Sequence, residues 1–373
     1  MKENTRRLID YSLPAVFENI LQTSVGFVDS VLIAKISLVA VSAVSLVNGV
    51  MAVYQAVFIA LAVAVATVVS NAAGARASKA VSENVRQSTA LSLMVGVILS
   101  ILSLVLAHPI LRAMGASGDI LQQGIIFFRV IAGTSVLIVL MTVLGQLIRT
   151  AGQTRTPLTI NLIVNILNFC LDFILIFGLF GFPRLGILGA GIGTALSRLI
   201  GVGLLFHKLQ QTSHRLQGPI FSRDQHIFKT EIVKRALPIM GERLMMRLGD
   251  IVIFVIIIAY GSKVFAGNAI GETITAYNYL PAFGFATGAS ILIARAYGAK
   301  DHLEIRKLTK TSFVMTAIIS TLVGGIIFAF STFILNFFTF DAVAVSAAQV
   351  VILISFVSEP IVAGVIIYTA ALQ

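Results

Sequence analysis

Ten apolar stretches, each long enough to cross a lipid bilayer as a helix, dominate this sequence. They fall near residues 13–35, 43–72, 88–111, 121–149, 157–180, 187–207, 232–260, 266–295, 311–335 and 345–371. A membrane-spanning helix needs about 20 apolar residues, and the stretches lack the alternation that membrane β-strands of about ten residues require. With 12% charged residues, the chain is also too apolar for a soluble domain, in which about 25% are charged. We therefore expect an all-α, polytopic membrane protein.

Positive charge lies mainly at the N-terminus and in every second connection between these stretches. The other connections hold only Lys35, Arg112, Arg184 and Lys263. Because positively charged loops stay on the cytoplasmic side, we expect a cytoplasmic N-terminus and a multi-pass protein of the plasma or inner membrane. The net charge of +11 is then mainly a topology signal, and we expect membrane lipids but no nucleic acid among the partners.

Sequence signatures of catalysis are absent. The chain has no Gly-x-x-x-x-Gly-Lys-Ser/Thr phosphate loop and no Gly-x-Ser-x-Gly elbow. Cys170 is the single cysteine, and the five histidines fall near the ends of apolar stretches or in connections, which does not favour a zinc site within the membrane. We expect neither an enzyme nor a bound cofactor.

An internal repeat relates the two halves of the chain. Residues 224 positions apart match across two apolar stretches and a loop: Leu13-Pro14 and Leu237-Pro238, Glu18 and Glu242, Ala72 and Ala296, Gly74-Ala75-Arg76 and Gly298-Ala299-Lys300, Arg86 and Lys310, Ser88 and Ser312. Since the first copy holds an even number of stretches, both copies enter the membrane in the same direction. Parallel repeats of this kind build secondary transporters.

The repeat predicts two six-helix lobes, of which the second lacks its last two helices. At the 224-residue offset Arg149 corresponds to Gln373, whereas the first copy continues through two more apolar stretches. We expect a first lobe at residues 1–210, a cytoplasmic linker at 211–231 and a four-helix second lobe at 232–373.

Several segments resemble the multidrug and toxic compound extrusion family, a branch of a larger group that also contains lipid-linked oligosaccharide flippases. The resemblance rests on Phe27-Val28-Asp29-Ser30, on the segments 70–76 and 294–300, on Arg149–Pro157 and on Gly189–Ser197. It implies twelve helices in two lobes, and export of cationic, amphipathic compounds coupled to inward flow of H⁺ or Na⁺. The chain departs from the family at Gln153, where Gly-Asp-Thr is usual, and in the two absent helices.

Polar side chains at membrane depth mark the candidate site in the first lobe. Asn161, Asn165, Asn168 and Asp172 follow one another at helical spacing and share one helix face. Glu18, Gln22 and Asp29 share a face of the first stretch in the same way. Counted at 1.5 Å per residue, Asp29 and Asp172 lie about 20–25 Å from the cytoplasmic ends of their helices, and Thr194 lies about 10 Å from the opposite end, at the same level.

The resemblance assigns Asp29, Asn168, Asp172 and Thr194 to a cation-binding cluster. Two carboxylates in a poorly solvated cavity cannot both stay ionised cheaply, so such a pair takes up H⁺ or Na⁺. Apart from Na⁺ at this cluster, we expect no metal. The alternative is that these polar groups only hold neighbouring helices together through hydrogen bonds.

The second lobe contributes less clear candidates for a cavity or gate. They are Glu242, Arg247, Asp250 and Glu359, to which Glu18, Gln22 and Asn165 are added from the first lobe. Arg247 and Asp250 share a face and favour an ion-paired stripe. Glu359 precedes Pro360, whose missing N–H commonly kinks a helix.

Together these features predict a monomeric antiporter that exports amphipathic organic cations in exchange for H⁺ or Na⁺ by alternating access. The sequence does not choose between the two ions. The alternatives are a flippase for a lipid-linked or anionic substrate on the same architecture, and an inactive fragment.

Overall fold

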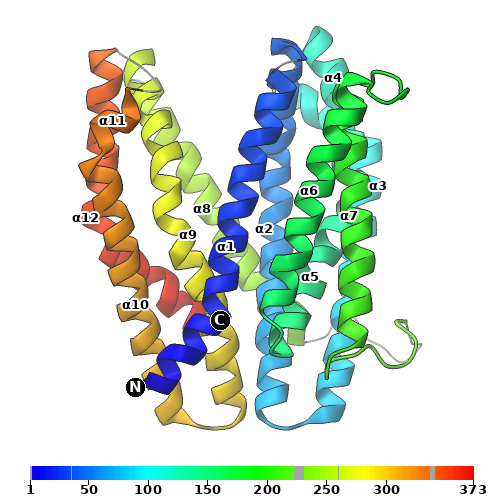
Figure 1. Cartoon of the computed structure of the whole chain (residues 1–373), viewed down its shortest axis with the longest axis vertical. Helices are drawn as coiled ribbons and strands as arrows, with labels where there is room; N and C mark the ends of the chain where they lie inside the picture. Colours follow the sequence, from blue (N-terminus) through cyan, green and yellow to red (C-terminus); the bar gives the residue numbers. More distant parts are fainter. Residues whose placement is uncertain (1, 35, 222–230, 259, 337–340) are drawn as a thin grey trace. The chain divides into compact units, whose positions relative to one another are not determined.

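Helices joined by short turns make up most of the described chain (Figure 1). The structure is a computed structural model that describes residues 2–34, 36–221, 231–258, 260–336 and 341–373. Its helices are α1 (Lys2–Ala34), α2 (Leu38–Gly74), α3 (Ser78–Ala113), α4 (Gly118–Ile131), α5 (Ser135–Thr150), α6 (Arg155–Phe177), α7 (Ile187–Gln210), α8 (Glu231–Ile258), α9 (Ser262–Gly298), α10 (His302–Ala329), α11 (Ser331–Leu335) and α12 (Ala342–Leu372).

In each of the ten predicted stretches most of the described residues are helical, which confirms the all-α fold class. Within the described residues, α2, α3, α6, α7, α10 and α12 are long and apolar enough to span a membrane. Helices α4 and α5, which meet at a bend of 42°, form a seventh span if they are counted together. The stretches 13–35, 232–260 and 266–295 coincide with α1, α8 and α9, which are not among these spans.

Helix boundaries in the two halves agree with the 224-residue offset. Helices α2 and α9 both begin and end 224 positions apart, and the starts of α3 and α10, and of α4 and α12, are separated by the same number. The turns between α2 and α3 and between α9 and α10 also share a backbone conformation, since Arg76 and Lys300 have φ values of 54° and 59°.

The two halves differ where the first one breaks a span. Val136 lies in the first turn of α5, and its N–H donates to the Ser100 hydroxyl of α3 at 3.2 Å, because the first N–H groups of a helix have no partner within it. At the 224-residue offset Ser100 corresponds to Gly324 and Val136 to Pro360. Proline has no N–H to satisfy, and α12 continues through Pro360 as one helix.

The chain packs as two compact units. Unit 2 comprises Leu21–Met240, and unit 1 comprises Met1–Ile20 with Gly241–Gln373. The unit boundaries therefore fall inside α1 and α8. The predicted lobes, 1–210 and 232–373, assign each helix to one lobe and so divide the chain differently.

Close packing explains why the first half of α1 belongs to unit 1. A Cβ on Gly284 of α9 would lie 2.7 Å from the Val16 backbone nitrogen, and one on Gly288 would lie 3.0 Å from that of Ser12. Only glycine permits these approaches. Correspondingly, Ile232 and Ile239 at the start of α8 are buried in the main apolar cluster of unit 2.

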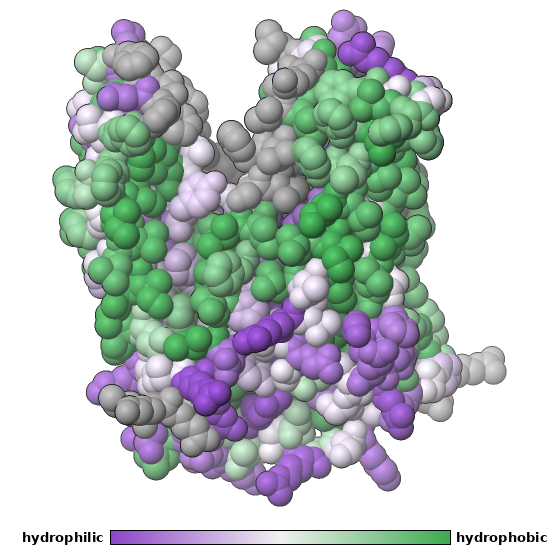
Figure 2. Space-filling model, viewed as in Figure 1, coloured by the Kyte–Doolittle hydropathy of each residue, from purple (hydrophilic) through white to green (hydrophobic). Residues whose placement is uncertain are grey.

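Helix α3 shows how side chains are distributed in a membrane bundle. Its exposed side chains include Ile101, Leu104 and Val105, whereas small residues such as Ser92 and Gly96 are buried. Small residues let membrane helices approach closely while apolar side chains face lipid. Figure 2 shows the same pattern at the surface, with hydrophobic residues over the middle of the flanks and hydrophilic residues toward the upper and lower ends.

Candidate functional site

The contact between α6 and α7 brings three of the four predicted cation-site residues together. The Asn168 side chain of α6 donates from Nδ2 to Thr194 Oγ1 of α7 at 3.2 Å. Thr194 in turn donates to the Ala190 carbonyl at 2.8 Å, which fixes its rotamer. Asn168 is buried, and Thr194 is partly buried. The direct bond between them joins the two helices at one level.

Asp172 lies one helical turn from Asn168 and is 2% exposed. A Cβ placed on Gly193 of α7 would lie 2.1 Å from its carboxylate oxygen Oδ1, a distance that real atoms do not reach. The carboxylate therefore rests against the bare backbone of Gly193. Asp172, Asn168 and Thr194 thus place carboxylate, amide and hydroxyl groups in one small volume, and these groups can hold a proton or a hard cation.

The remaining amides of the α6 stripe are less enclosed. Asn161 and Asn165 are both partly buried. Asn165 was predicted as a secondary candidate, and its position one turn before Asn168 is consistent with that face of α6.

On α1, the residues predicted to share one face belong to different units. Glu18 is 8% exposed and belongs to unit 1, whereas Gln22 is exposed and belongs to unit 2. The backbone of Asp29 is helical, but its side chain lies outside the described residues. Its predicted role beside Asp172 stays a prediction.

A second buried carboxylate occurs in unit 1, at Glu359 of α12. It is 0% exposed, and its Oε1 accepts from the Ser355 hydroxyl at 3.3 Å. Ser355 itself accepts from Asn278 Nδ2 of α9 at 3.1 Å. Gly324 of α10 completes the enclosure, because a Cβ there would lie 3.3 Å from Glu359 Cγ. Within the described chain, Glu359 Oε2 and Asn278 Oδ1 have no hydrogen-bond partner.

The sequence analysis missed Asn278 and Ser355. An amide inside the apolar stretch 266–295 was a signal, because a polar group at membrane depth needs a partner. Its partner could not be predicted, since Ser355 lies 77 residues away and no local pattern links the two.

Of the other second-lobe candidates, Glu242 and Arg247 lie outside the Glu359 cluster. Glu242 is exposed, and its Oε2 accepts from Gln373 Nε2 at 2.9 Å. Arg247 is exposed too. The side chain of Asp250 lies outside the described residues, so its predicted ion pair with Arg247 stays a prediction. Arg243, beside Glu242, lies with its guanidinium carbon 6.0 Å from the centre of the Phe283 ring, a cation–π distance.

Comparison with known proteins agrees with this fold. The MatE family model matches residues 14–174 and 238–373. The probable multidrug resistance protein NorM of Thermotoga maritima is 30% identical over 344 residues, which cover 91% of this chain and 73% of that protein. The uncharacterized transporter YisQ of Bacillus subtilis is 26% identical over 68% of this chain, which spans 56% of that protein's length.

A solved structure supports the same fold. It is described as an outward-facing conformation of a multidrug resistance MATE family transporter of the MOP superfamily, and it matches with a TM-score of 0.88 and 22% identity. The match covers 99% of this chain and 83% of that one. The chain therefore belongs to the MatE family, whose members are membrane transporters and not enzymes.

Proposed function

We propose that this protein is a secondary active antiporter that exports amphipathic organic cations in exchange for H⁺ or Na⁺ by alternating access, with its N-terminus in the cytoplasm. Family membership supports transport, and the names of the relatives, probable multidrug resistance proteins among them, support small organic compounds as substrates. The observation that carries the coupling step is the buried carboxylate of Asp172, which lies against Gly193, one helical turn from the hydrogen bond between Asn168 and Thr194.

Desolvation gives Asp172 its proposed role. An ionised carboxylate that is 2% exposed is costly unless a counter-charge or proton compensates it. Uptake of H⁺ or Na⁺ removes that cost, with Asn168 and Thr194 supplying hydrogen bonds or oxygen ligands. We include Asp29 in this cluster on the strength of the sequence. A bound ion shifts the conformational equilibrium only if it binds one state more tightly, and a buried carboxylate whose surroundings change between states meets that condition.

Glu359 is our proposed second ion-linked group. Its Oε1 accepts from Ser355, which itself accepts from Asn278, so the three side chains form a chain that ends on the carboxylate. This arrangement serves a carboxylate that binds and releases a cation, since the second oxygen is left for that ligand.

Transport by reconstituted protein tests the proposal. Proteoliposomes loaded with a fluorescent organic cation are given an imposed proton or sodium gradient, and release of the dye is followed. We expect release driven by one gradient, and we expect Asp172→Asn to lower the gradient-driven rate at least about tenfold because the amide cannot take up the ion.

Asp119→Asn is the matched control. Asp119 is exposed in the first turn of α4, so the same chemical change there should leave the rate within about twofold of the unsubstituted chain. Gradient-driven release that is equally fast with Asp172→Asn would contradict the role of Asp172. Release that ignores both gradients would contradict secondary transport itself.

A further inference from the structure

A basic cavity lies in unit 2 where α2 ends, α3 begins and the segment after α7 returns to the bundle. Its volume is about 660 Å³. The charged or titratable side chains that line it are Arg76, Lys79, Glu83, Arg86, His214 and Arg215. The proposed coupling site contains none of these residues.

The one carboxylate in this lining is already compensated. Glu83 Oε2 lies 2.6 Å from Arg86 Nη2, and Glu83 Oε1 accepts from Gln87 at 2.8 Å. Arg76, Lys79 and Arg215 remain, and in the described part of the chain no ion pair or hydrogen bond is recorded for their side chains. Three cations around one cavity repel each other and attract an anion.

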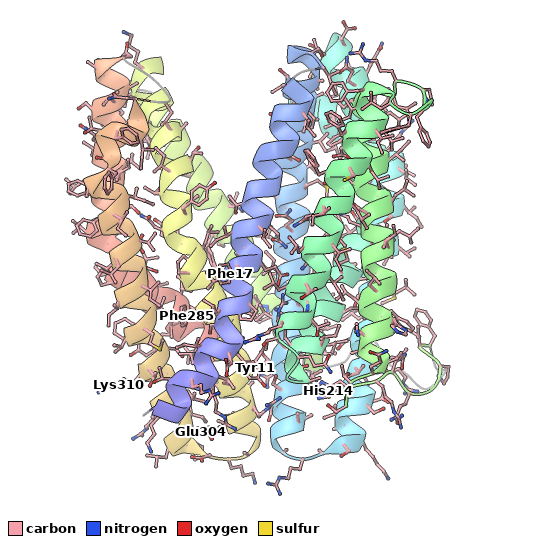
Figure 3. The ribbon with its side chains drawn as sticks, viewed as in Figure 1. Tyr11, Phe17, His214, Phe285, Glu304 and Lys310 are labelled. Carbon is pink, nitrogen blue, oxygen red and sulfur yellow. The ribbon has the colours of Figure 1, made fainter. Side chains whose placement is uncertain are left out.

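The segment that carries Arg215 is held firmly in place. Its neighbour His214 is 6% exposed, and His214 Nδ1 lies 3.1 Å from Thr150 Oγ1 at the end of α5. Thr150 also donates its hydroxyl proton to the Leu147 carbonyl at 2.8 Å. Figure 3 places His214 beside the lower ends of α6 and α7. Arg215 is therefore presented to the cavity by a fixed turn.

Arg76 occupies a backbone conformation that would suit glycine. Its φ is 54°, in the left-handed region, which costs a residue with a Cβ about 1–2 kcal/mol. A cytoplasmic connection favours positive charge, but that charge need not lie at the position with the strained φ. Lys300 in the corresponding turn of unit 1 shares this conformation, with φ 59°, so the strain belongs to the turn, and it is the surrounding cavity that singles out Arg76.

The start of α3 adds neutral donors to the same wall. Ser78 and Ser82 line the cavity, and no side chain caps the N-terminus of α3 at Ala77. Backbone N–H groups at a helix start favour phosphate oxygens. Here they supplement the three cations.

We propose that this cavity binds a phosphate group through Arg76, Lys79 and Arg215. The cavity walls belong to the connection between the predicted spans 43–72 and 88–111 and to the segment after the span 187–207, where we expect lipid headgroups to meet the protein. The phosphate of an anionic phospholipid is accordingly one source, and a soluble phosphate compound is the other.

Lipid titration of the purified chain by native mass spectrometry tests this site. Phosphatidylglycerol and phosphatidylcholine are compared for the unsubstituted chain and for the combined variant Arg76→Gly, Lys79→Gln and Arg215→Gln. Glycine is chosen at position 76 because it relieves the strained φ and so protects the fold. We expect the variant to bind phosphatidylglycerol at least about tenfold more weakly, with little change for phosphatidylcholine.

A comparison variant removes the same charge from the corresponding turn of unit 1 and from the start of α10. It combines Lys300→Gly, Arg306→Gln and Lys307→Gln, and Lys300 has the same strained conformation, with φ 59°. We expect this variant to bind phosphatidylglycerol as the unsubstituted chain does. Equal losses in the two variants, or no loss in the cavity variant, would overturn the proposal.

Two further arms identify the source of the phosphate and exclude misfolding. Thermal stabilisation by millimolar inorganic phosphate, lost in the cavity variant, assigns the site to a soluble phosphate compound, whereas stabilisation by phosphatidylglycerol alone assigns it to lipid. Stabilisation by neither contradicts the proposal. The charge-conserving variant Arg76→Lys, Lys79→Arg and Arg215→Lys should keep binding within about threefold, and a tenfold loss there would show a structural effect instead.

Discussion

At the scale of single residues, glycine decides where the buried carboxylate of Asp172 can lie. Gly193 lies within α7 and has helical backbone angles, so its backbone does not require glycine. A Cβ at this position would nevertheless collide with Asp172 Oδ1, at a distance of 2.1 Å. Gly203, three turns further along α7, has open space where its Cβ would be. The two positions share a helix and differ only in what faces them.

Replacing these glycines by alanine separates packing from helix propensity. We expect Gly193→Ala to destabilise the protein by about 1–3 kcal/mol, as overpacking does, and to reduce gradient-driven transport by displacing Asp172. Gly203→Ala should be neutral or stabilising by up to about 1 kcal/mol, because alanine favours the helix. Thermal unfolding in detergent measures both. Equal melting temperatures for the two variants would show that the Asp172–Gly193 contact is not tight.

A surface carboxylate gives a prediction of pH dependence. The pKa of Asp341, at the start of α12, is lowered mainly by the hydrogen bond from Lys263 Nζ at 2.6 Å, and also by the backbone N–H of Ala344. A lowered folded-state pKa means that this pair contributes stability above the ordinary pKa of aspartate, and that the contribution is lost as the pH falls through the depressed value.

Removing the lysine should therefore raise the pKa of Asp341. We expect Lys263→Ala to move it toward the ordinary value but not to reach it, because the backbone donors of Val343 and Ala344 remain. Carbon-13 NMR of labelled aspartate carboxyls in nanodiscs measures the titration. Lys234→Ala, in an exposed pair with Glu231, serves as the control and should leave Asp341 unchanged.

At the scale of elements, the break between α4 and α5 shows how one helix completes another. The span needs an acceptor for the Val136 N–H, and α3 supplies the Ser100 hydroxyl. In the second half of the chain Gly324 and Pro360 stand at the matching positions, so donor and acceptor are both absent. The helix break before α5 and the serine that accepts from its free N–H therefore occur together in the first half and are both missing from the second.

Loss of this cap should destabilise unit 2. Because a buried N–H without a partner costs about 1–3 kcal/mol, we expect Ser100→Ala to lower stability by about that amount. Ser197→Ala is the control, since Ser197 is also buried but donates to the Thr194 carbonyl of its own helix at 2.9 Å. Thermal unfolding compares the stability of the two variants. A larger loss of stability for Ser197→Ala than for Ser100→Ala would contradict the role of Ser100 as a cap of α5.

At the scale of the whole molecule, the distribution of positive charge predicts how the chain lies in the membrane. Helix α6 is 23 residues long, about 35 Å at 1.5 Å per residue, which is enough to cross a bilayer. It begins at Arg155, in a predicted cytoplasmic connection, and Arg184 lies in the connection beyond its other end.

Cysteine labelling checks this orientation. In a Cys170→Ser background, we expect Arg155→Cys to react with a membrane-impermeant maleimide only in inside-out vesicles, and Arg184→Cys only in right-side-out vesicles. Both arginines are exposed, so access depends on the side of the membrane. The opposite pattern would reverse the predicted topology.

The sequence was sufficient for everything that depends on local pattern. The length of the apolar stretches predicted the helices, and the 224-residue register anticipated boundaries as distant as Gly74 and Gly298. The spacing of Asn168 and Asp172 placed them on one face of a helix, because helical periodicity is a property of neighbouring residues. The resemblance supplied Thr194 as their partner.

Contacts between helices were decided only by the tertiary structure. Three such contacts join segments far apart in sequence. They are the contact of Asp172 with Gly193, the hydrogen-bond chain from Asn278 through Ser355 to Glu359, and the cavity lined by Arg76 and Arg215. They depend on the rotation of each helix and on where small residues allow close approach, and neither is encoded in a local pattern. The sequence determined which elements form and which polar groups they carry into the membrane, and packing determined which of those groups meet.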